Sequence, residues 1–245
     1  MPELVESINC PKCGGPLTLA PGEVIVTCPY CGTVSRFQGD KAFVLRHSML
    51  SARVDRDGAV RTIQGWMEGG VMKPDDLRKA SRIAAMECIY LPFYVFEVDA
   101  TTTYTGVLSR TGTNERRSGD LRRDYFWKIL GRRSGDFMVR DSRFLNAEVD
   151  EDEADRIARE QVDDHQRQLL KDLVDTIEDA RTAIDVKDVE FLHAPIWFST
   201  YEYRGQTFQI LIDAASGEVI RGDIPPPSGG FGEFMKGAAK DLFRR

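Results

Sequence analysis

Four cysteines near the N-terminus have the residue type and the spacing of a metal site. They form two C-x2-C pairs separated by 14 residues: Cys10, Cys13, Cys28 and Cys31. Two residues between thiolates let one tight turn present both sulfurs to one ion, and the spacer is long enough for a hairpin that returns the second pair. The pattern predicts a zinc ribbon over residues 1–38, with one structural Zn²⁺ as its cofactor.

The surroundings of the cysteines favour a structural metal rather than a catalytic one. Four thiolates leave no coordination position for an activated water, so we do not expect hydrolytic metal chemistry. Gly14 and Gly32 follow the second cysteine of each pair, where a tight turn favours a positive φ. Pro21 and Gly22 predict a turn, and residues 24–26 predict a strand that returns to the second pair. Because so small a ribbon has hardly any core, we expect the metal to hold its fold.

No other residues form a recognisable catalytic set. His47, His165 and His193 fall in separate segments. We expect His165 to pack in the core, because it lies on an apolar stripe, whereas His193 could face Glu202 or Asp213. The chain has no G-x-S-x-G, H-E-x-x-H or dinucleotide-binding motif. We therefore predict that the protein is not an enzyme.

The composition is that of an ordinary globular protein. The 245 residues are 42% hydrophobic and 29% charged, and the formal net charge is -6, which argues against a nucleic-acid-binding surface over the whole molecule. The N-terminus lacks the apolar region of a secretory signal, and no apolar run approaches the ~20 residues of a spanning helix. We expect a cytoplasmic protein without a transmembrane segment. In that reducing compartment metal is favoured over disulfides, and the lone Cys88 is expected to be a small buried hydrophobe.

The chain beyond the ribbon predicts an α+β fold with an antiparallel sheet. Three parts are expected: zinc ribbon 1–38, α+β body 39–225, and linker with C-terminal amphipathic docking helix 226–245. The body is predicted to consist of two related helix-plus-meander lobes, about 39–145 and 146–225. Both lobes have a Pro-x-aromatic entry into a strand, at 92–94 and 195–197. A chance likeness of two aromatic strands is the alternative.

The first lobe is predicted to contain a helix and then a strand. Pro74 and the acids that follow it are typical of a first helical turn, and apolar residues recur at helical spacing from Leu77 to Cys88. Residues 90–106 are rich in aromatic and β-branched side chains, which predicts a strand.

The second lobe is predicted to repeat this order. An apolar stripe indicates a helix from Asp150 through Ile184, whose acids at 150–155 favour the positive end of the helix dipole over a metal site. Residues 191–220 then predict an antiparallel meander, with turns at 204–205 and 216–217.

Several motifs together resemble one group of proteins. They are CPKCGGPL with CPYCGT, Trp66, MKPDDL, YLPFYVFEVDATTTYTG, a loop with Trp127, and APIWFSTYEYRGQTFQILIDAASGEVIRGDIP. Over most of the chain, to about Pro225, they are similar to uncharacterised bacterial and archaeal zinc-ribbon proteins that are often labelled after the replication-restart (primosomal) helicase. The final meander also resembles a PepSY-like unit, which ends in a D-x-x-x-G-x-V turn.

The helicase label implies a nucleotide-driven motor. The chain has no G-x-x-x-x-G-K-[ST] loop to hold phosphates, and the likeness to a helicase rests on the ribbon alone, so we do not expect motor activity. Members of the group often continue into hydrophobic segments, which implies a membrane location. Here PPPSGGFGEFMKGAAKDLFRR follows instead, so we do not expect membrane insertion.

Residues 110–143 are the strongest candidate for nucleic-acid binding. They hold nine arginines and one lysine against five acids, with aromatic residues between them. Basic side chains could neutralise phosphates, and aromatic ones could stack on unpaired bases. The alternative is a long hairpin whose aromatic side chains point into the core and whose arginines pair with nearby acids. The candidate contacts to nucleic acid or a partner are Arg116, Arg117, Arg122, Arg123, Trp127, Arg132 and Arg133.

The C-terminal segment has the pattern of a docking helix. Apolar residues that can line one side of a short helix follow the Pro/Gly-rich linker: Phe231, Phe234, Met235, Leu242 and Phe243. We expect this segment to dock on a partner or on its own chain. Peripheral contact with an anionic membrane is the other alternative.

Together these features predict a non-catalytic zinc-ribbon adaptor or assembly protein that mediates protein–protein interaction or self-association. The alternative is a nucleic-acid-binding accessory protein that uses the ribbon and residues 110–143.

Overall fold

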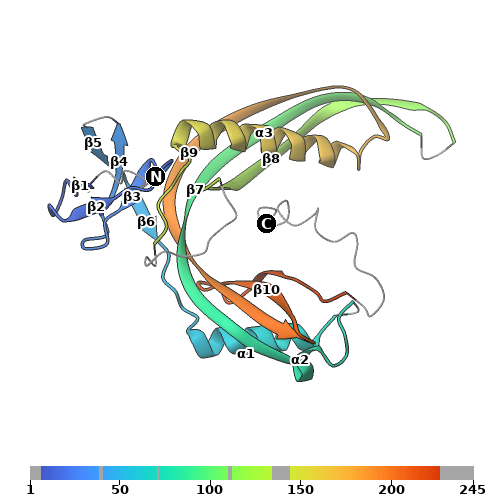
Figure 1. The fold of residues 1–245 in the computed structure, drawn as a ribbon. Coiled ribbons are helices and arrows are strands. Elements are labelled where there is room, and N and C mark those ends of the chain that lie inside the picture. Colours follow the sequence, from blue (N-terminus) through green and yellow to red (C-terminus); the bar gives the residue numbers. More distant parts are fainter. Residues whose placement is uncertain (1–6, 39–40, 71, 110–111, 134–143, 227–245) are drawn as a thin grey trace.

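A long, curved sheet dominates the computed structural model, which describes residues 7–38, 41–70, 72–109, 112–133 and 144–226. Two strands of 28 residues each, β7 (Ser81–Leu108) and β9 (Thr176–Tyr203), pair antiparallel along almost their whole length. The strand order is β11-β10-β9-β7-β8, and β6 pairs in parallel with β9. The remaining strands of this sheet are β6 (His47–Met49), β8 (Glu115–Leu130), β10 (Gln206–Asp213) and β11 (Val219–Gly222). Figure 1 shows the sheet bent into a C shape.

The long strands follow from β-branched and aromatic runs, and irregular pairing lets them bend. The register between β7 and β9 shifts at three points: Ile83/Ala85, Glu97/Val98 and Thr105/Gly106. An extra residue on one strand of a pair increases the local twist and bends the strand. At the last of these points a Cβ on Gly106 would lie 2.5 Å from the carbonyl oxygen of Thr176, so this close approach requires glycine.

Two amphipathic helices cover one face of the sheet. α1 (Arg56–Glu68) packs on β10 and β11, and α3 (Glu151–Leu170) packs on β7, β8 and β9. Both helices are capped, because the carboxylates of Asp55 and Asp150 accept hydrogen bonds from backbone N–H groups in the first turn. Met86 packs in the hydrophobic cluster that includes the buried residues of α1, and Tyr94 packs in the cluster that includes those of α3. The two residues are an even number of positions apart, in a stretch of β7 without a register shift. Both helices therefore lie on the same face.

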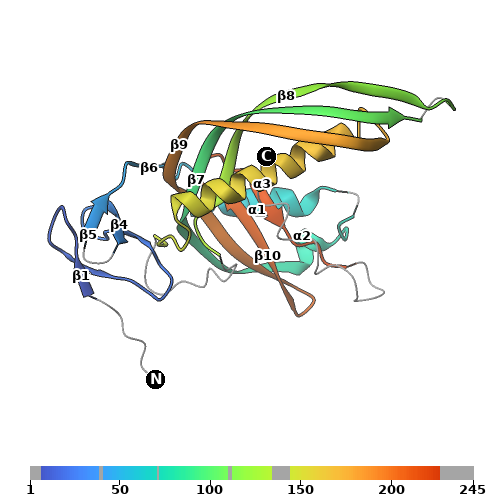
Figure 2. The same cartoon turned by 90° about the horizontal axis from the view of Figure 1, so that it is seen from above.

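The ribbon lies on the outside of the bend, next to β6 and the start of α3 (Figures 1 and 2). It contains a two-stranded sheet, β1-β2, and a three-stranded sheet, β3-β4-β5. Its strands are β1 (Ser7–Asn9), β2 (Pro16–Thr18), β3 (Ile25–Thr27), β4 (Val34–Gln38) and β5 (Lys41–Val44). The ribbon sheet thus continues past residue 38. Ile25 and Val34 belong to the same buried cluster as Tyr94 and Ala154, so the ribbon shares the core of the body.

Two predicted helices are wrong in extent. Only α2 (Leu77–Ala80) is helical in the stretch from Leu77 to Cys88, because the chain enters β7 at Ser81 and pairs with β9. The helix predicted from Asp150 through Ile184 ends at Leu170, and residues from Thr176 onward belong to β9. In both cases the helical spacing continues into residues that pair with a distant strand, and tertiary pairing overrides the local pattern.

Other expectations are confirmed. The fold mixes helices with antiparallel sheets, and its final meander is β9, β10 and β11 with positive φ at Arg204, Gly205 and Gly217. The acids at the start of α3 lie in its first turn. The strands of both expected lobes lie in one continuous sheet. The expected docking helix, with Phe231, Phe234, Met235, Leu242 and Phe243, lies outside the described residues.

Candidate metal centre

The four predicted cysteines come together at one point of the ribbon. Their sulfur atoms all lie within 4.8 Å of one another. Cys10 Sγ is 3.7 Å from Cys31 Sγ, and Cys13 Sγ is 3.7 Å from Cys28 Sγ. A disulfide needs about 2.05 Å, whereas a tetrahedron with metal–sulfur bonds of about 2.3 Å has edges of about 3.8 Å. The cluster therefore has the dimensions of a tetrahedral metal site.

The turns that carry the cysteines have the expected geometry. Gly14 and Gly32 both have positive φ, at 73° and 71°. The N–H groups of these glycines donate to the carbonyl oxygens of Cys10 and Cys28, which closes each turn. Cys31 Sγ lies 3.2 Å from the Thr33 hydroxyl, and hydrogen bonding with Thr33 lowers the pKa of the Cys31 thiol. The Gly15 N–H lowers the pKa of the Cys13 thiol, but hydrogen bonds with the other cysteines outweigh it and raise that pKa.

A nearly buried arginine joins the ribbon to the body. Arg132 Nη1 lies 3.2 Å from Glu23 Oε1 of the ribbon and donates to the carbonyl oxygen of Asn146 at 2.8 Å. Arg132 Nη2 lies 2.7 Å from Glu148 Oε1. These three charged side chains are 11–16% exposed. One guanidinium therefore pairs with two carboxylates, one on each side of the junction.

A pair of histidines lies at the same junction. His47 Nε2 and His193 Nδ1 are 3.1 Å apart, and His193 Nε2 donates to the carbonyl oxygen of Leu145 at 3.0 Å. The Thr27 hydroxyl, next to Cys28, is 3.4 Å from His193 Nε2. Since Nε2 of His193 carries the proton for the carbonyl, its Nδ1 accepts the N–H of His47. Desolvation holds the pKa of His193 at about 4.

The histidine pair corrects the prediction for His193. Its side chain faces His47 and Leu145 rather than Glu202 or Asp213. His165 packs as expected, with ring centroids 5.5 Å from those of Tyr125 and Trp127. Sequence reasoning missed the histidine pair because its members are 146 residues apart. The apolar neighbours of His193 in a predicted strand were the one available signal.

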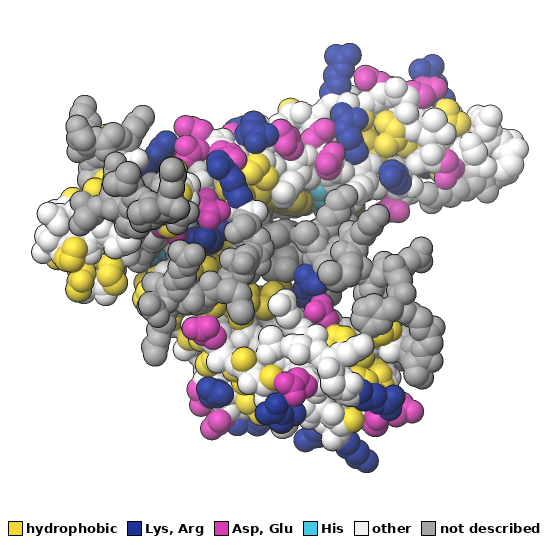
Figure 3. Space-filling model, viewed as in Figure 1, with side chains coloured by type: hydrophobic (Ala, Val, Ile, Leu, Met, Phe, Trp, Pro, Cys, Tyr) yellow, Lys and Arg dark blue, Asp and Glu magenta, His cyan; other side chains and the backbone are white. Residues whose placement is uncertain are grey.

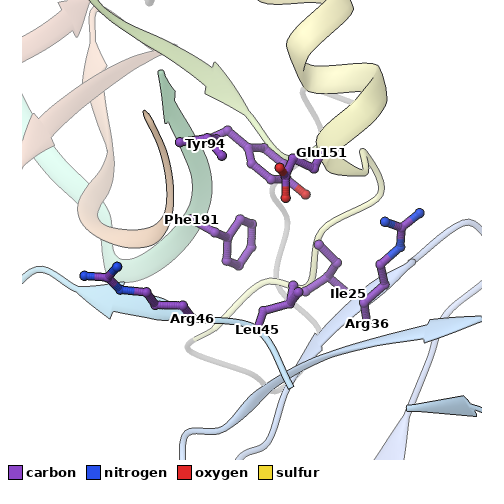
Figure 4. Close-up of a pocket in the computed structure, with 8 residues that line it drawn as sticks. Ile25, Arg36, Leu45, Arg46, Tyr94, Glu151 and Phe191 are labelled. Atoms are coloured by element: carbon purple, nitrogen blue, oxygen red, sulfur yellow. The ribbon is translucent and has the colours of Figure 1, made fainter. Parts of the chain in front are cut away.

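A small pocket lies between the ribbon and the body. Its volume is about 140 Å³, and its walls include Ile25, Leu45 and Phe191. Figure 4 shows the guanidinium groups of Arg36 and Arg46 on opposite sides of the pocket, pointing away from each other. Arg36 is moreover paired with Asp150 at 3.2 Å, and Tyr94 donates to a backbone carbonyl. The lining side chains do not converge as a catalytic set would.

In its described part, residues 112–133, the basic segment forms the second arm of a long hairpin, as the alternative interpretation has it, and the arginines there have partners. Arg116 of β8 pairs with Glu178 of β9, and within β8 Arg117 pairs with Glu115 and Arg122 with Asp120. Arg123 donates to the carbonyl oxygen of Arg122.

The remaining members of the candidate set are also engaged. Trp127 is half-buried against α3, where its N–H donates to Gln161 at 3.0 Å. Arg132 is held at the junction, and Arg133, just beyond β8, pairs with Glu153. The structure therefore brings the seven residues onto one hairpin and its end, with every cationic group bonded to a neighbour.

Comparisons with known proteins give no relative. No family model, no curated protein and no solved structure matches this chain. Within the described ranges, no helix is both long and apolar enough to cross a membrane. The five cysteines are all free of disulfide bonds.

The histidine pair predicts a loss of stability in acid. Unfolded His193 takes up a proton near its ordinary pKa of 6.5, whereas the folded side chain does so only near 4. The stability that this difference contributes is present above pH 6.5 and is lost as the pH falls toward 4, by about 3 kcal/mol in total.

Urea unfolding at pH 7.5 and pH 4.5 measures this loss of stability. The variant His193→Gln should lack this component of the pH dependence and His165→Gln should keep it; equal slopes in the two variants would contradict the assignment.

Proposed function

We propose that the protein is a non-catalytic adaptor whose cysteines hold one structural Zn²⁺ and whose ribbon binds a protein partner. Zinc is the metal that fits a closed site of four thiolates best. The finer division of the body into two related helix-plus-meander lobes, with a docking segment at 226–245, is part of the same proposal.

The observation that carries this proposal is the distribution of exposed hydrophobic side chains. Eight large hydrophobic side chains are exposed in the described part of the chain, and five of them lie between residues 30 and 50. Tyr30, Phe43 and Val44 lie on the ribbon, whereas Met49 and Leu50 lie at the end of β6 in the large sheet; we call these five side chains the ribbon patch. Figure 3 shows hydrophobic side chains on the ribbon end of the molecule. A concentration of exposed apolar side chains in one stretch of the chain supports a protein interaction site there.

The setting of the ribbon patch supports recognition. β5 is the outer strand of the ribbon sheet and presents Phe43 and Val44, which are 48% and 60% exposed. Tyr30 lies in the second cysteine turn and is 66% exposed. The metal and the Arg132 junction hold these side chains on a rigid support, and a rigid support lowers the entropy cost of binding.

The nucleic-acid alternative lacks a comparable observation. The arginines of the hairpin are bonded to neighbours, and Trp127 is packed against α3. Phe126 is 71% exposed, but a single aromatic side chain is a small stacking surface.

Affinity capture with matched variants tests the adaptor proposal. The variant Phe43→Ser/Val44→Ser removes the β5 side chains of the ribbon patch, and Met72→Ser/Phe126→Ser removes two hydrophobic side chains elsewhere that are still more exposed. Both leave the cysteines in place. We expect the first variant to lose at least one partner that the wild type and the control variant retain, because apolar anchors provide most of the binding free energy at an interface.

Two outcomes would count against the proposal. Identical partners for all three proteins would exclude the ribbon patch. The nucleic-acid alternative would be favoured if the Phe43→Ser/Val44→Ser variant kept all partners and nuclease digestion removed them. Metal content and circular dichroism of each variant confirm that the ribbon is still folded.

A further inference from the structure

An apolar layer lies on one face of the sheet, at the bend. Ile89, Leu91, Ile196 and Leu211 are 2–8% exposed. The hydrophobic side chains packed against them come from the same sheet and from the segment beside it: Phe93, Leu130, Leu145, Phe198 and Ile220. Because its members come from β7, β8, β9, β10 and β11, this apolar layer crosses the whole width of the sheet.

The apolar layer faces away from both long helices. Ile89 and Leu91 alternate along β7 with the positions of Met86 and Tyr94, which lie in the clusters of α1 and α3. Neighbouring residues of a strand point to opposite faces. Over residues 7–226, as far as they are described, no helix packs on the apolar layer. A hydrophobic sheet face in water needs a second element to cover it.

The chain leaves the sheet at the margin of the apolar layer. Ile220 belongs to β11, which is the edge strand, and the next residues are still held to the sheet. The N–H of Asp223 donates to the carbonyl oxygen of Gln209 at 2.9 Å, and the Asp223 carbonyl accepts from the Tyr201 hydroxyl. Residues 227–245 therefore begin within a few residues of the apolar layer.

The sequence of residues 227–245 fits the apolar layer in pattern and in length. Phe231, Phe234, Met235, Ala238 and Leu242 would share one side of an α-helix. Such a helix rises about 18 Å between residues 231 and 243. Five strands about 4.8 Å apart span about 19 Å. The residues between 226 and 231 can reach about 17 Å when extended, which is enough to place the helix across the strands.

The charges beside the apolar layer complement those of the segment. Glu97, Asp188 and Glu190 are exposed on the same face, just beyond Phe93, and form no ion pair with another described residue. Residues 227–245 contain four basic and two acidic side chains. A short tether also gives the segment a high effective concentration at its own sheet.

From these observations we propose that residues 227–245 dock on the apolar layer of their own chain, as a short amphipathic helix that crosses the strands. The segment then forms the second layer of the sheet at its bend.

Full-length variants test the docking. Phe231→Ser/Phe234→Ser/Leu242→Ser removes the apolar side of the segment, and Glu233→Ser/Lys236→Ser/Lys240→Ser changes three residues on the other side. The apolar variant should bind an environment-sensitive apolar dye several-fold more than the wild type, and amides of β10 should exchange faster. The control variant loses two of the four basic side chains but keeps the apolar side, so it should change both signals far less than the apolar variant does. Equal dye binding and exchange in all three proteins would overturn the proposal.

A peptide of residues 228–245 identifies the docking surface. The labelled peptide should bind the apolar variant and suppress its dye signal, and it should bind the wild type more weakly because the layer is occupied. Failure of the peptide to bind would overturn the proposal. A wild-type dimer that the apolar substitutions dissociate would instead place the segment on a second copy. A dye signal that rises only after Phe137→Ser would assign the cover to residues 134–143.

Discussion

Replacing Cys10 and Cys13 by serine is expected to abolish metal binding and to unfold the ribbon while the large sheet stays folded. On the proposal of one structural Zn²⁺, the metal is expected to provide much of the ribbon's stability, since Zn²⁺ binds such sites with about 10–16 kcal/mol. The sheet should survive because the long pair β7 and β9 and both helices lie outside the ribbon. It should be weakened, because Ile25 and Val34 leave a shared core. Metal analysis and hydrogen exchange, read separately for residues 7–44 and 81–213, measure both effects.

Cys88→Ser is the matched control for the cysteine substitutions. Cys88 lies on β7 and is not among the four clustered thiols, so this variant should retain one equivalent of metal and an intact ribbon. Metal retained by the Cys10→Ser/Cys13→Ser protein would show that the cluster is not the site. Collapse of the whole sheet in that variant would show that the ribbon and the body fold as one unit.

The Arg132→Leu variant is expected to lose about 3–5 kcal/mol of unfolding free energy, the usual cost of removing one partner of a buried ion pair. Its removal leaves the carboxylates of Glu23 and Glu148 nearly buried without their shared cation. The ribbon should also detach more readily, because Arg132 spans the junction. Urea unfolding measures the loss, and exchange at the amides of β3 reports detachment.

The next residue along the chain provides the control. Arg133 pairs with Glu153, but its side chain is 61% exposed, so Arg133→Leu should cost about 1 kcal/mol or less. A similar loss in both variants would mean that the junction is no more sensitive than the surface. Raised salt should reduce the effect of Arg133→Leu more than that of Arg132→Leu, because buried charges are screened less.

The metal centre could be predicted from the sequence because its geometry is local. Two cysteines in one turn and glycine after each pair determine how the sulfurs are presented, and both turns have the predicted positive φ. The final meander was predictable for the same reason, since its turns contain Gly205 and Gly217. In these places short-range sterics set the conformation, and a window of a few residues contains the necessary information.

The extent of the helices and the junction depended on distant residues. Ile83 and Cys88 fit a helical stripe, yet they pair with Tyr201 and Trp197 in the sheet. The contacts of Arg132 with Glu23 and of His47 with His193 join residues more than a hundred positions apart. The ribbon patch was overlooked because Phe43 and Val44 look like core residues of a strand until the topology shows that β5 is an edge. These features depend on which strands pair in the fold, and a single sequence does not show that pairing.

The pairing of β7 with β9 also has a consequence for folding during synthesis. Ser81 pairs with Tyr203 and Val107 with Thr176, so β7 has no partner on that side until residues 176–203 have been synthesised. At about 5–20 residues per second, the ribosome needs roughly 5–20 s between completing β7 and completing β9. During that interval the hairpin of β7 and β8 can form, but its other edge stays open, and an open edge strand can pair with other chains. Folding of the large sheet should therefore be slow, and a chaperone that shields β7 during synthesis should raise the yield more than added metal does.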